Sequence, residues 1–308
     1  RAPIRGQYRG VEIIGPPPPA SGGVHVVQML NILEGYDLAG MGYGAPETIH
    51  LIAEAMKIAF ADRDASTGDP AFLNVPVEQL ISKAYAEDRR ALIDPTCAQT
   101  WAPGVPPLNE SPHTTHMTVV DKDGAIVTAT HTINSLFGAR YIIGETGMIA
   151  NNYMSLFDPH PGRALSIQAG KRVPTSMAPV MGVQDGAVQF ALGLTGGVRI
   201  FPSAMLAILN LIDHGMSLQE AVEAPRVWTQ GGVLELESGG AAGAAASLQA
   251  MGHTTVETPH LGGGMNGVRR MPDGHWQGAA CWRADGTTIA LGGGNARKGV
   301  RFWPEQAR

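Results

Sequence analysis

The stretch TTHMTVVDKDGAIVTATHTIN, residues 114–134, decides the fold of this chain. It holds two runs rich in β-branched residues, THMTVV (115–120) and AIVTATHTI (125–133), on either side of Asp123-Gly124. An Asp-Gly pair between two such runs is a strong hairpin signal, because both residues tolerate the positive φ angles of a tight turn. The sequence therefore predicts two antiparallel strands, with Thr114 at the start of the first.

The hairpin signal recurs along the second half of the chain, at Asp185-Gly186, Asp273-Gly274 and Asp285-Gly286. APVMGV (178–183) and AVQFALG (187–193) are predicted strands around the first of these pairs. Helical spacing of apolar residues predicts helices over 21–35, 47–63, 80–94, 199–214, 217–224 and 241–251. Ser217 and Glu220 have the spacing of a capping box at the start of the fifth. Helices with an antiparallel sheet indicate an α+β layered architecture.

Composition excludes several classes of protein. The 308 residues are 44% apolar and 16% charged, with 40 Gly and 22 Pro, which rules out a disordered chain and suits one large or two small domains. A net charge of −5, without runs of like charge, argues against a nucleic-acid partner or an anionic membrane surface. We expect no membrane span in this chain, because no stretch approaches about 18 apolar residues. Cys97 and Cys281 match no metal or redox spacing.

Thr114 is a candidate nucleophile. It follows a Pro-rich, aperiodic stretch over 95–113, so a cut between His113 and Thr114 would give it a free α-amino group beside its own hydroxyl. Such an amine, with an unperturbed pKa of about 8, can act as the base for that hydroxyl. From spacing alone, an ordinary threonine at the start of a strand is the commoner explanation.

Gly196-Gly197 is a candidate oxyanion site. The pair follows the apolar run 188–194 and precedes a predicted helix, so its backbone amides can face a developing negative charge at a helix N-terminus. The alternative is a strand-to-helix turn that only needs glycine, and spacing favours that alternative.

Other patterns carry no cofactor or metal chemistry. Gly262, Gly264 and Gly267 fit a G-x-G-x-x-G pattern, but no helix follows, which argues against a dinucleotide site. His113 and His116 lack a second His or Cys cluster to complete a metal site. The carboxylates Asp62, Asp64 and Asp69 lack the spacing of a calcium loop. The sequence therefore predicts neither a cofactor nor a metal ion.

Eight segments, in order between residues 5 and 255, together resemble one family. They are PPPPASGGVHVVQMLNILEGYDL (16–38), HLIAEAMKIAFADR (50–63), GDPAF (68–72), TTHMTVVDKDG (114–124), NN (151–152), KRVPTSMAP (171–179), GLTGGVRI (193–200) and EAVEAPRV (220–227). The chain thereby resembles the γ-glutamyltransferase family of N-terminal-nucleophile hydrolases. This resemblance outweighs the commoner explanation of Thr114.

The resemblance implies a four-layer αββα sandwich and autocatalytic cleavage before Thr114. Residues 1–113 would then be the C-terminal part of a large subunit and 114–308 a small subunit, both within one domain. Thr114 would attack a γ-amide carbonyl, and water or an amine acceptor would take the acyl group. The resemblance assigns the supporting roles as follows: Thr132 supports the nucleophile, Gly196 and Gly197 form the oxyanion hole, Asn134 holds the glutamyl group, and Thr175 and Ser176 contact the substrate carboxylate.

Two departures from the family pattern concern the acyl donor. Tyr153 and Leu156 occupy positions where typical members carry an acidic or amide residue and an Asp that grip the donor's α-ammonium group. Losing that charge-assisted hydrogen bond costs about 1.5–3 kcal/mol, or one to two decades in affinity. The donor is therefore expected to lack an α-amino group. In the short segment 157–170, His160 and Arg163 either meet a carboxylate of the substrate or belong to a self-contained surface loop.

Three hypotheses follow for the function. The first is a Thr amidohydrolase or acyltransferase acting on γ-glutamyl amides of the glutathione type. The second keeps the machinery but takes a glutaryl-type or cephalosporin side-chain amide. The third is an inactive relic that acts as a binding protein. The family resemblance also implies an N-terminal precursor segment upstream of Arg1, as a partner, and a periplasmic or secreted location.

Overall fold

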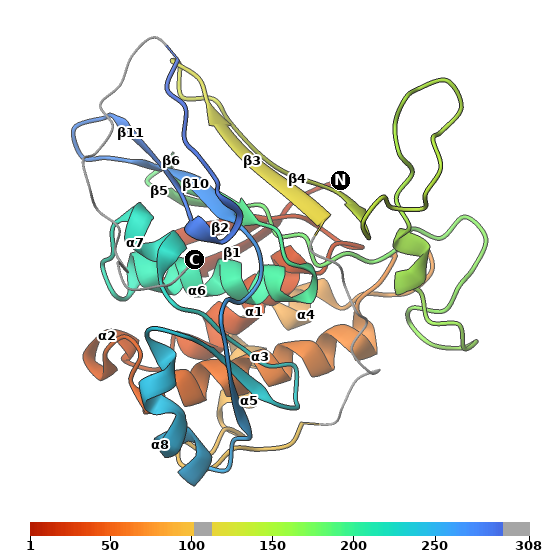
Figure 1. Cartoon of the computed structure of the whole chain (residues 1–308). Coiled ribbons are helices and arrows are strands. Elements are labelled where there is room, and N and C mark those ends of the chain that lie inside the picture. The colour runs from red at the N-terminus through yellow and green to blue at the C-terminus, as the bar shows by residue number, and fades with distance from the viewer. Residues whose placement is uncertain (102–112, 292–308) are drawn as a thin grey trace.

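The computed structural model describes residues 1–101 and 113–291, in which helices and sheets are stacked in layers (Figure 1). The largest sheet has six strands in the order β1-β2-β5-β6-β10-β11, and every neighbouring pair is antiparallel. Its strands are β1 (Ile4–Tyr8), β2 (Val11–Gly15), β5 (Val180–Gln184), β6 (Ala187–Leu194), β10 (Met265–Arg270) and β11 (Trp276–Ala280). Segments on both sides of Thr114 therefore contribute to one sheet.

The predicted hairpin forms a second sheet, made of β3 (His113–Val120) and β4 (Ile126–Asn134). It packs on β6 and β10 of the large sheet, and the Asn266 side-chain amide donates to the His116 carbonyl at 2.8 Å across the interface. At Gly193 on β6 a Cβ atom would lie 2.3 Å from the His116 ring, so only glycine lets the two layers approach this closely.

The other face of the large sheet is covered by helices. α1 (Gly22–Leu33) packs on β1 and β2, α6 (Ile200–Ile212) on β6, and α7 (Leu218–Glu223) on β10 and β11, while α3 (Pro46–Ser66) packs on α1 (Figure 1). All residues of α1 are buried, and its polar residues His25, Gln28 and Asn31 are hydrogen-bonded within the chain. The main core lies between these helices and the sheet.

Shorter elements complete the described chain. A small sheet joins β7 (Val227–Trp228), β8 (Leu234–Glu237) and β9 (Thr255–Thr258), with β8 and β9 parallel. The short helices are α2 (Leu38–Met41), α4 (Val77–Leu80), α5 (Lys83–Arg90) and α8 (Ala245–Ala250), and the 3₁₀ turns are η1 (Tyr153–Leu156), η2 (Gly197–Arg199), η3 (Ala241–Ala244) and η4 (Trp282–Ala284). None of the helices among the described residues has the length and hydropathy that crossing a bilayer requires.

Most of the predicted turns and helices are confirmed. Asp123-Gly124, Asp185-Gly186 and Asp273-Gly274 each connect two antiparallel strands, and Ser217 and Glu220 form the predicted capping box. The prediction of a hairpin at Asp285-Gly286 is wrong, because Asp285 ends η4 in a left-handed conformation and no strand follows it up to residue 291. The prediction of a single helix over 80–94 is also wrong, because the chain turns at Ile81 and the Ser82 hydroxyl caps a new helix, α5.

Candidate active site

Thr114 and Thr132 face each other across the β3–β4 hairpin. The Thr114 hydroxyl donates to the Thr132 hydroxyl at 2.9 Å, and Thr132 in turn accepts from the Asn134 backbone N–H at 2.9 Å. A bulge between His113 and Thr114 interrupts the register at this point. Bulges re-aim side chains and are common next to active sites. The hairpin therefore fixes the direction of the Thr114 hydroxyl.

Asn134 ends β4 in a strained conformation that its side chain helps to hold. Its φ is +69°, a left-handed region that asparagine tolerates better than most residues. Its side-chain amide donates to the Asn152 side-chain oxygen at 3.0 Å, and the same oxygen accepts from the Ser135 backbone N–H at 3.0 Å. Asn152 also donates to the Ser135 hydroxyl at 2.8 Å. The second Asn of the pair 151–152 thus positions the end of the β3–β4 hairpin.

Gly196 and Gly197 lie just beyond the end of β6, before α6. Gly196 has φ +129° and Gly197 φ +62°, values that L residues with side chains rarely adopt. A Cβ atom on Gly196 would lie 2.7 Å from the Gly263 backbone nitrogen, so the position excludes any side chain. Backbone bonds link the two segments, from Gly263 N–H to the Thr195 carbonyl at 2.9 Å and from Thr195 N–H to the Gly264 carbonyl at 3.2 Å.

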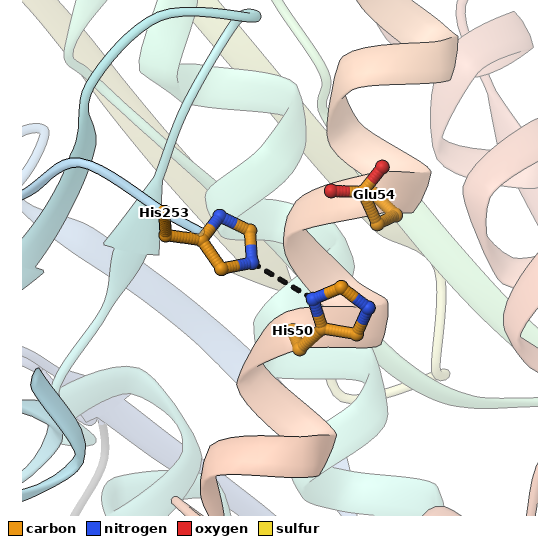
Figure 2. A group of neighbouring side chains, drawn as sticks. All are labelled: His50, Glu54 and His253. Atoms are coloured by element: carbon orange, nitrogen blue, oxygen red, sulfur yellow. Dashed lines mark hydrogen bonds between the residues drawn. The ribbon is translucent and has the colours of Figure 1, made fainter. Parts of the chain in front are cut away.

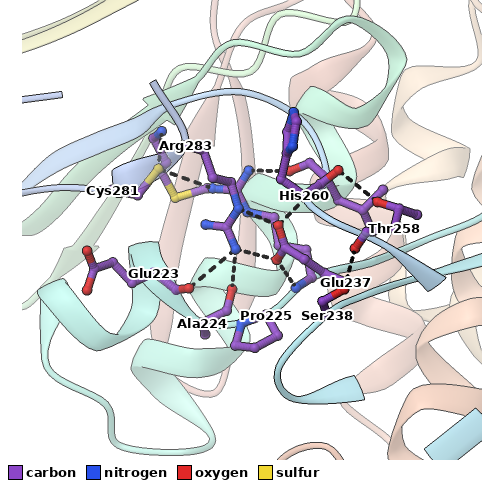
Figure 3. Close-up of polar contacts among 12 residues, drawn as sticks. Glu223, Ala224, Pro225, Glu237, Ser238, Thr258, His260, Cys281 and Arg283 are labelled. Atoms are coloured by element: carbon purple, nitrogen blue, oxygen red, sulfur yellow. Dashed lines mark hydrogen bonds and ion pairs between the residues drawn. The ribbon is translucent and has the colours of Figure 1, made fainter. Parts of the chain in front are cut away.

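A buried ionic cluster that includes Glu237 and Arg283 (Figure 3) is bonded to the segment that packs on this glycine turn. Arg226 donates to the carbonyls of Leu261 and Gly263 at 2.9 and 3.0 Å, which holds the segment that packs on Gly196. Glu237 accepts from the Leu261 backbone N–H at 2.8 Å and pairs with Arg283, and both charged side chains are fully buried. The turn that carries the candidate oxyanion amides is therefore held rigidly.

Thr175 and Ser176 meet the Pro-rich segment that precedes α1. The Thr175 carbonyl accepts from the Ser21 backbone N–H at 2.8 Å, and the Ser176 hydroxyl is bonded to the Arg63 guanidinium at 3.2 Å. A Cβ atom on Gly22 would lie 2.3 Å from the Met177 carbonyl, so glycine is required for this contact. Two motifs that lie about 150 residues apart in the sequence thereby form one surface.

Tyr153 and Leu156 lie at the two ends of η1. The Tyr153 hydroxyl is 3.4 Å from the hydroxyl of Thr175, one of the two residues predicted to contact the substrate carboxylate. Leu156 is 3% exposed and is part of an apolar interior. Thr175 and Tyr153 are thus neighbours in space.

Two histidines and one arginine that the sequence singled out have hydrogen-bond partners within the chain. His116 is buried between Thr118, Thr128 and Thr130, and burial lowers its pKa to about 4, so its ring is neutral at physiological pH. His160 and Arg163 both bind the Asp158 carboxylate, at 2.8 and 3.0 Å. Of the two alternatives for segment 157–170, the structure favours the self-contained loop.

Sequence reasoning did not identify Arg63, Ser135 or Asn152 as individual contributors. Arg63 is buried beside Ser21 and Ser176, although arginine is rarely buried without partners. The signal for Asn152 was its place in the Asn-Asn pair, but only the tertiary structure shows its contact with Asn134. The stretch between Trp101 and His113, which contains most of the predicted exposed connection, lies outside the described residues.

Comparison with known proteins places this chain in one family. The profile of the Gamma-glutamyltranspeptidase family matches residues 1–291. The chain is 63% identical to the Acylase ACY 1 proenzyme of Pseudomonas sp. (strain SE83) over 98% of its own length and 54% of that protein. It is 38% identical to the Glutathione hydrolase proenzyme of Escherichia coli (strain K12), over 91% of this chain and 51% of that protein. The chain thus spans about half the length of these curated relatives.

Solved structures show the same likeness in three dimensions. A cephalosporin acylase from Bacillus halodurans superposes with a TM-score of 0.85 at 28% identity, covering 95% of this chain and 53% of that one. A gamma-glutamyltranspeptidase from Pseudomonas nitroreducens, complexed with L-DON, superposes with a TM-score of 0.52 at 30% identity, over 57% of this chain and 99% of that one. The mixed helix-and-sheet fold described above is therefore shared with acylases and transpeptidases.

Proposed function

Because this chain belongs to the gamma-glutamyltranspeptidase family, we propose that it is a self-processing amidohydrolase or acyltransferase with Thr114 as its N-terminal nucleophile. The observation that carries the proposal is the Thr114 hydroxyl bonded to Thr132, at a bulge that opens the hairpin. Proenzyme relatives support a cut between His113 and Thr114, as does the position of that peptide bond directly after the Pro-rich stretch.

The first proposed step is cleavage of the chain. The Thr114 oxygen attacks the His113 carbonyl carbon, the amide C–N bond breaks, and the His113 acyl group moves from nitrogen to oxygen as an ester, while the hydroxyl proton passes to the released nitrogen. Water then hydrolyses this ester, which yields a carboxylate on His113 and a free α-amino group on Thr114. The product has its base and its nucleophile on one residue, an arrangement that activates a hydroxyl near neutral pH.

The second proposed step is acyl transfer. The Thr114 amine removes the hydroxyl proton as the oxygen attacks the substrate's amide carbonyl, and the amides of Gly196 and Gly197 bind the resulting oxyanion. Collapse breaks the substrate C–N bond, and the amine returns the proton to the leaving amine. Water or an amine acceptor then takes the acyl group from the Thr114 ester. A rigid glycine turn suits this role, since preorganised donors need no rearrangement during the reaction.

We propose an acyl donor of the glutaryl type, with a carboxylate but no α-amino group. Thr175 and Ser176 supply hydroxyls for the distal carboxylate, with the Arg63 guanidinium directly behind Ser176. Tyr153 and the buried Leu156 provide no anion for an α-ammonium group. The high identity to an acylase proenzyme supports this substrate class.

A γ-glutamyl amide such as glutathione is the second candidate donor. The identity to the Glutathione hydrolase proenzyme of Escherichia coli supports it, as does the role of holding the glutamyl group that the family resemblance implies for Asn134. Hydrolysis of glutaryl-p-nitroanilide and of γ-glutamyl-p-nitroanilide separates the two candidates. We expect a higher kcat/KM for the glutaryl compound, and equal or faster γ-glutamyl turnover would refute our choice.

Replacing Tyr153 tests the residue behind this preference. Tyr153→Glu supplies an anion for the α-ammonium group, so we expect the γ-glutamyl to glutaryl ratio of kcat/KM to rise by about ten- to a hundredfold. Tyr153→Gln is the matched control, because it changes shape in the same way without adding charge. A ratio that moves equally in both variants would show that charge at this position does not set donor choice.

We also propose that an upstream precursor segment covers the hairpin and completes the four-layer αββα sandwich. Along β3, Thr114, His116 and Thr118 face the large sheet, whereas Met117 and Val119 are about half exposed. An exposed apolar face beside a polar inner one indicates a further layer. Residues 1–113 and 114–308 would then be two chains of one domain, in a periplasmic or secreted protein.

The mass of the full precursor after purification tests the nucleophile. We expect two chains that separate at His113–Thr114, and a single uncut, inactive chain for Thr114→Ala. If the wild-type protein stays uncut and Thr114→Ala leaves its properties unchanged, the inactive binding protein would be the correct hypothesis.

A further inference from the structure

Three buried side chains outside the acyl-transfer site converge on one point. His50 and Glu54 come from α3, and His253 comes from the turn between α8 and β9 (Figure 2). One ligand atom from each lies within 4.8 Å of the others, and none of the three residues is more than 6% exposed. His50 and Glu54 are four residues apart on one helix and therefore share a face.

Hydrogen bonds fix the tautomers of the two histidines. His50 Nε2 lies 2.8 Å from the Asp94 carbonyl, which can only accept, so this nitrogen carries the proton and His50 Nδ1 is an acceptor. That acceptor faces His253 Nε2 at 2.8 Å. The two ring nitrogens thus face each other, His253 Nε2 donates to His50 Nδ1, and a backbone carbonyl fixes the outer nitrogen of His50. Metal-bound histidines are characteristically oriented by such outer partners.

The Glu54 carboxylate is held in a similar way. Oε2 accepts from the Trp101 indole N–H at 2.7 Å, and Oε1 accepts from Lys57 at 2.7 Å and from the Gln99 backbone N–H at 3.4 Å. Each carboxylate oxygen has two lone pairs, so Oε2 can bind Trp101 and a metal ion together. The ligand set is therefore two neutral imidazoles and one carboxylate.

We propose that His50, Glu54 and His253 form a Zn²⁺ site, with water as the fourth ligand. Two imidazoles and a carboxylate suit zinc, whereas Mg²⁺ and Ca²⁺ prefer ligand sets made of oxygen. The ion takes the place of the Nε2 proton that His253 donates to His50, and that proton moves to His253 Nδ1, so the ring stays neutral and no proton is released. Zn–N distances of about 2.0–2.1 Å require the two nitrogens to separate to roughly 3.3 Å. This proposal departs from the sequence expectation of no metal ion.

Lys57 limits the affinity of this site. Its ammonium group binds Glu54 and the Gln99 carbonyl at 3.0 Å, and it repels a divalent cation at the same carboxylate. Removing this charge should therefore tighten zinc binding. Bound zinc would tie the segment 94–101 more firmly to α3, because Asp94, Gln99 and Trp101 are all bonded to the cluster.

Zinc titration of the metal-stripped full chain tests the proposal, with a chromophoric chelator as competitor. We expect one Zn²⁺ per chain, and at least tenfold weaker binding in His50→Gln and in His253→Gln, since glutamine keeps a hydrogen bond but is a poor zinc ligand. His275→Gln, an exposed histidine in the β10–β11 turn, is the control and should bind as the wild type does. Zinc binding equal in all four proteins, or no stoichiometric binding, would overturn the proposal.

Cobalt and Lys57 provide two further readouts. Co²⁺ in the site should show the visible absorption bands of a four-coordinate ion, and these bands should disappear in His253→Gln. Lys57→Met should bind Zn²⁺ at least tenfold more tightly than the wild type. Unchanged or weaker binding in a folded Lys57→Met protein would contradict the place of the ion beside Glu54. Neither readout depends on acyl transfer.

Discussion

Thr132→Val is the sharpest test of the nucleophile hairpin. The substitution keeps a β-branched shape but removes the hydroxyl that accepts from Thr114 at 2.9 Å and from the Asn134 N–H at 2.9 Å. A net hydrogen bond contributes about 0.5–1.5 kcal/mol, so losing the one to Thr114 should slow self-cleavage about three- to tenfold. Asn134 is 5% exposed, and its unpaired N–H should lower the free energy of unfolding by about 1–3 kcal/mol.

The assay follows the fraction of precursor cut at His113–Thr114 over time, together with urea unfolding of the uncut form. Thr132→Ser restores a hydroxyl and should recover most of the cleavage rate. Thr128→Val is the matched control, since Thr128 lies on β4 as Thr132 does but bonds Thr118 and His116 on β3 and not Thr114. Equal cleavage rates for Thr132→Val and Thr128→Val would refute the idea that Thr132 supports the nucleophile.

Three further substitutions test other parts of the site. Gly196→Ala places a Cβ atom 2.7 Å from a backbone nitrogen at φ +129°, so it should abolish turnover. In thermal melts it should also destabilise the fold by more than Gly186→Ala, for which we expect roughly 1 kcal/mol because no atom lies within 4 Å of the added Cβ. Arg283→Met removes the ion-pair partner of the fully buried Glu237 carboxylate and should cost about 3–5 kcal/mol in urea unfolding. Burial lowers the pKa of His116 from 6.5 to about 4, so between these pH values the unfolded chain binds a proton that the folded chain does not. The free energy of unfolding therefore falls as the pH drops from about 6.5 to 4. His116→Gln should flatten this part of a plot of unfolding free energy against pH.

Much of the fold could be predicted from local sequence. Turn chemistry at Asp123-Gly124 and apolar spacing in 22–33 and 200–212 act over a few residues, and these elements formed as predicted. The prediction failed at Asp285-Gly286, where a left-handed Asp ends a 3₁₀ turn, because the same dipeptide serves more than one kind of turn. Ser82 likewise started a new helix where apolar spacing predicted a continuous one.

The sequence by itself determined the hairpin, the candidate nucleophile and the family resemblance, because these depend on residues that are close along the chain. Only the tertiary structure decided which distant residues meet. Tyr153 lies beside Thr175, Arg63 lies behind Ser176, and His253 faces His50 across 203 residues of sequence. Such contacts depend on how layers pack, and packing is set by buried surfaces and close backbone approaches that no local pattern encodes.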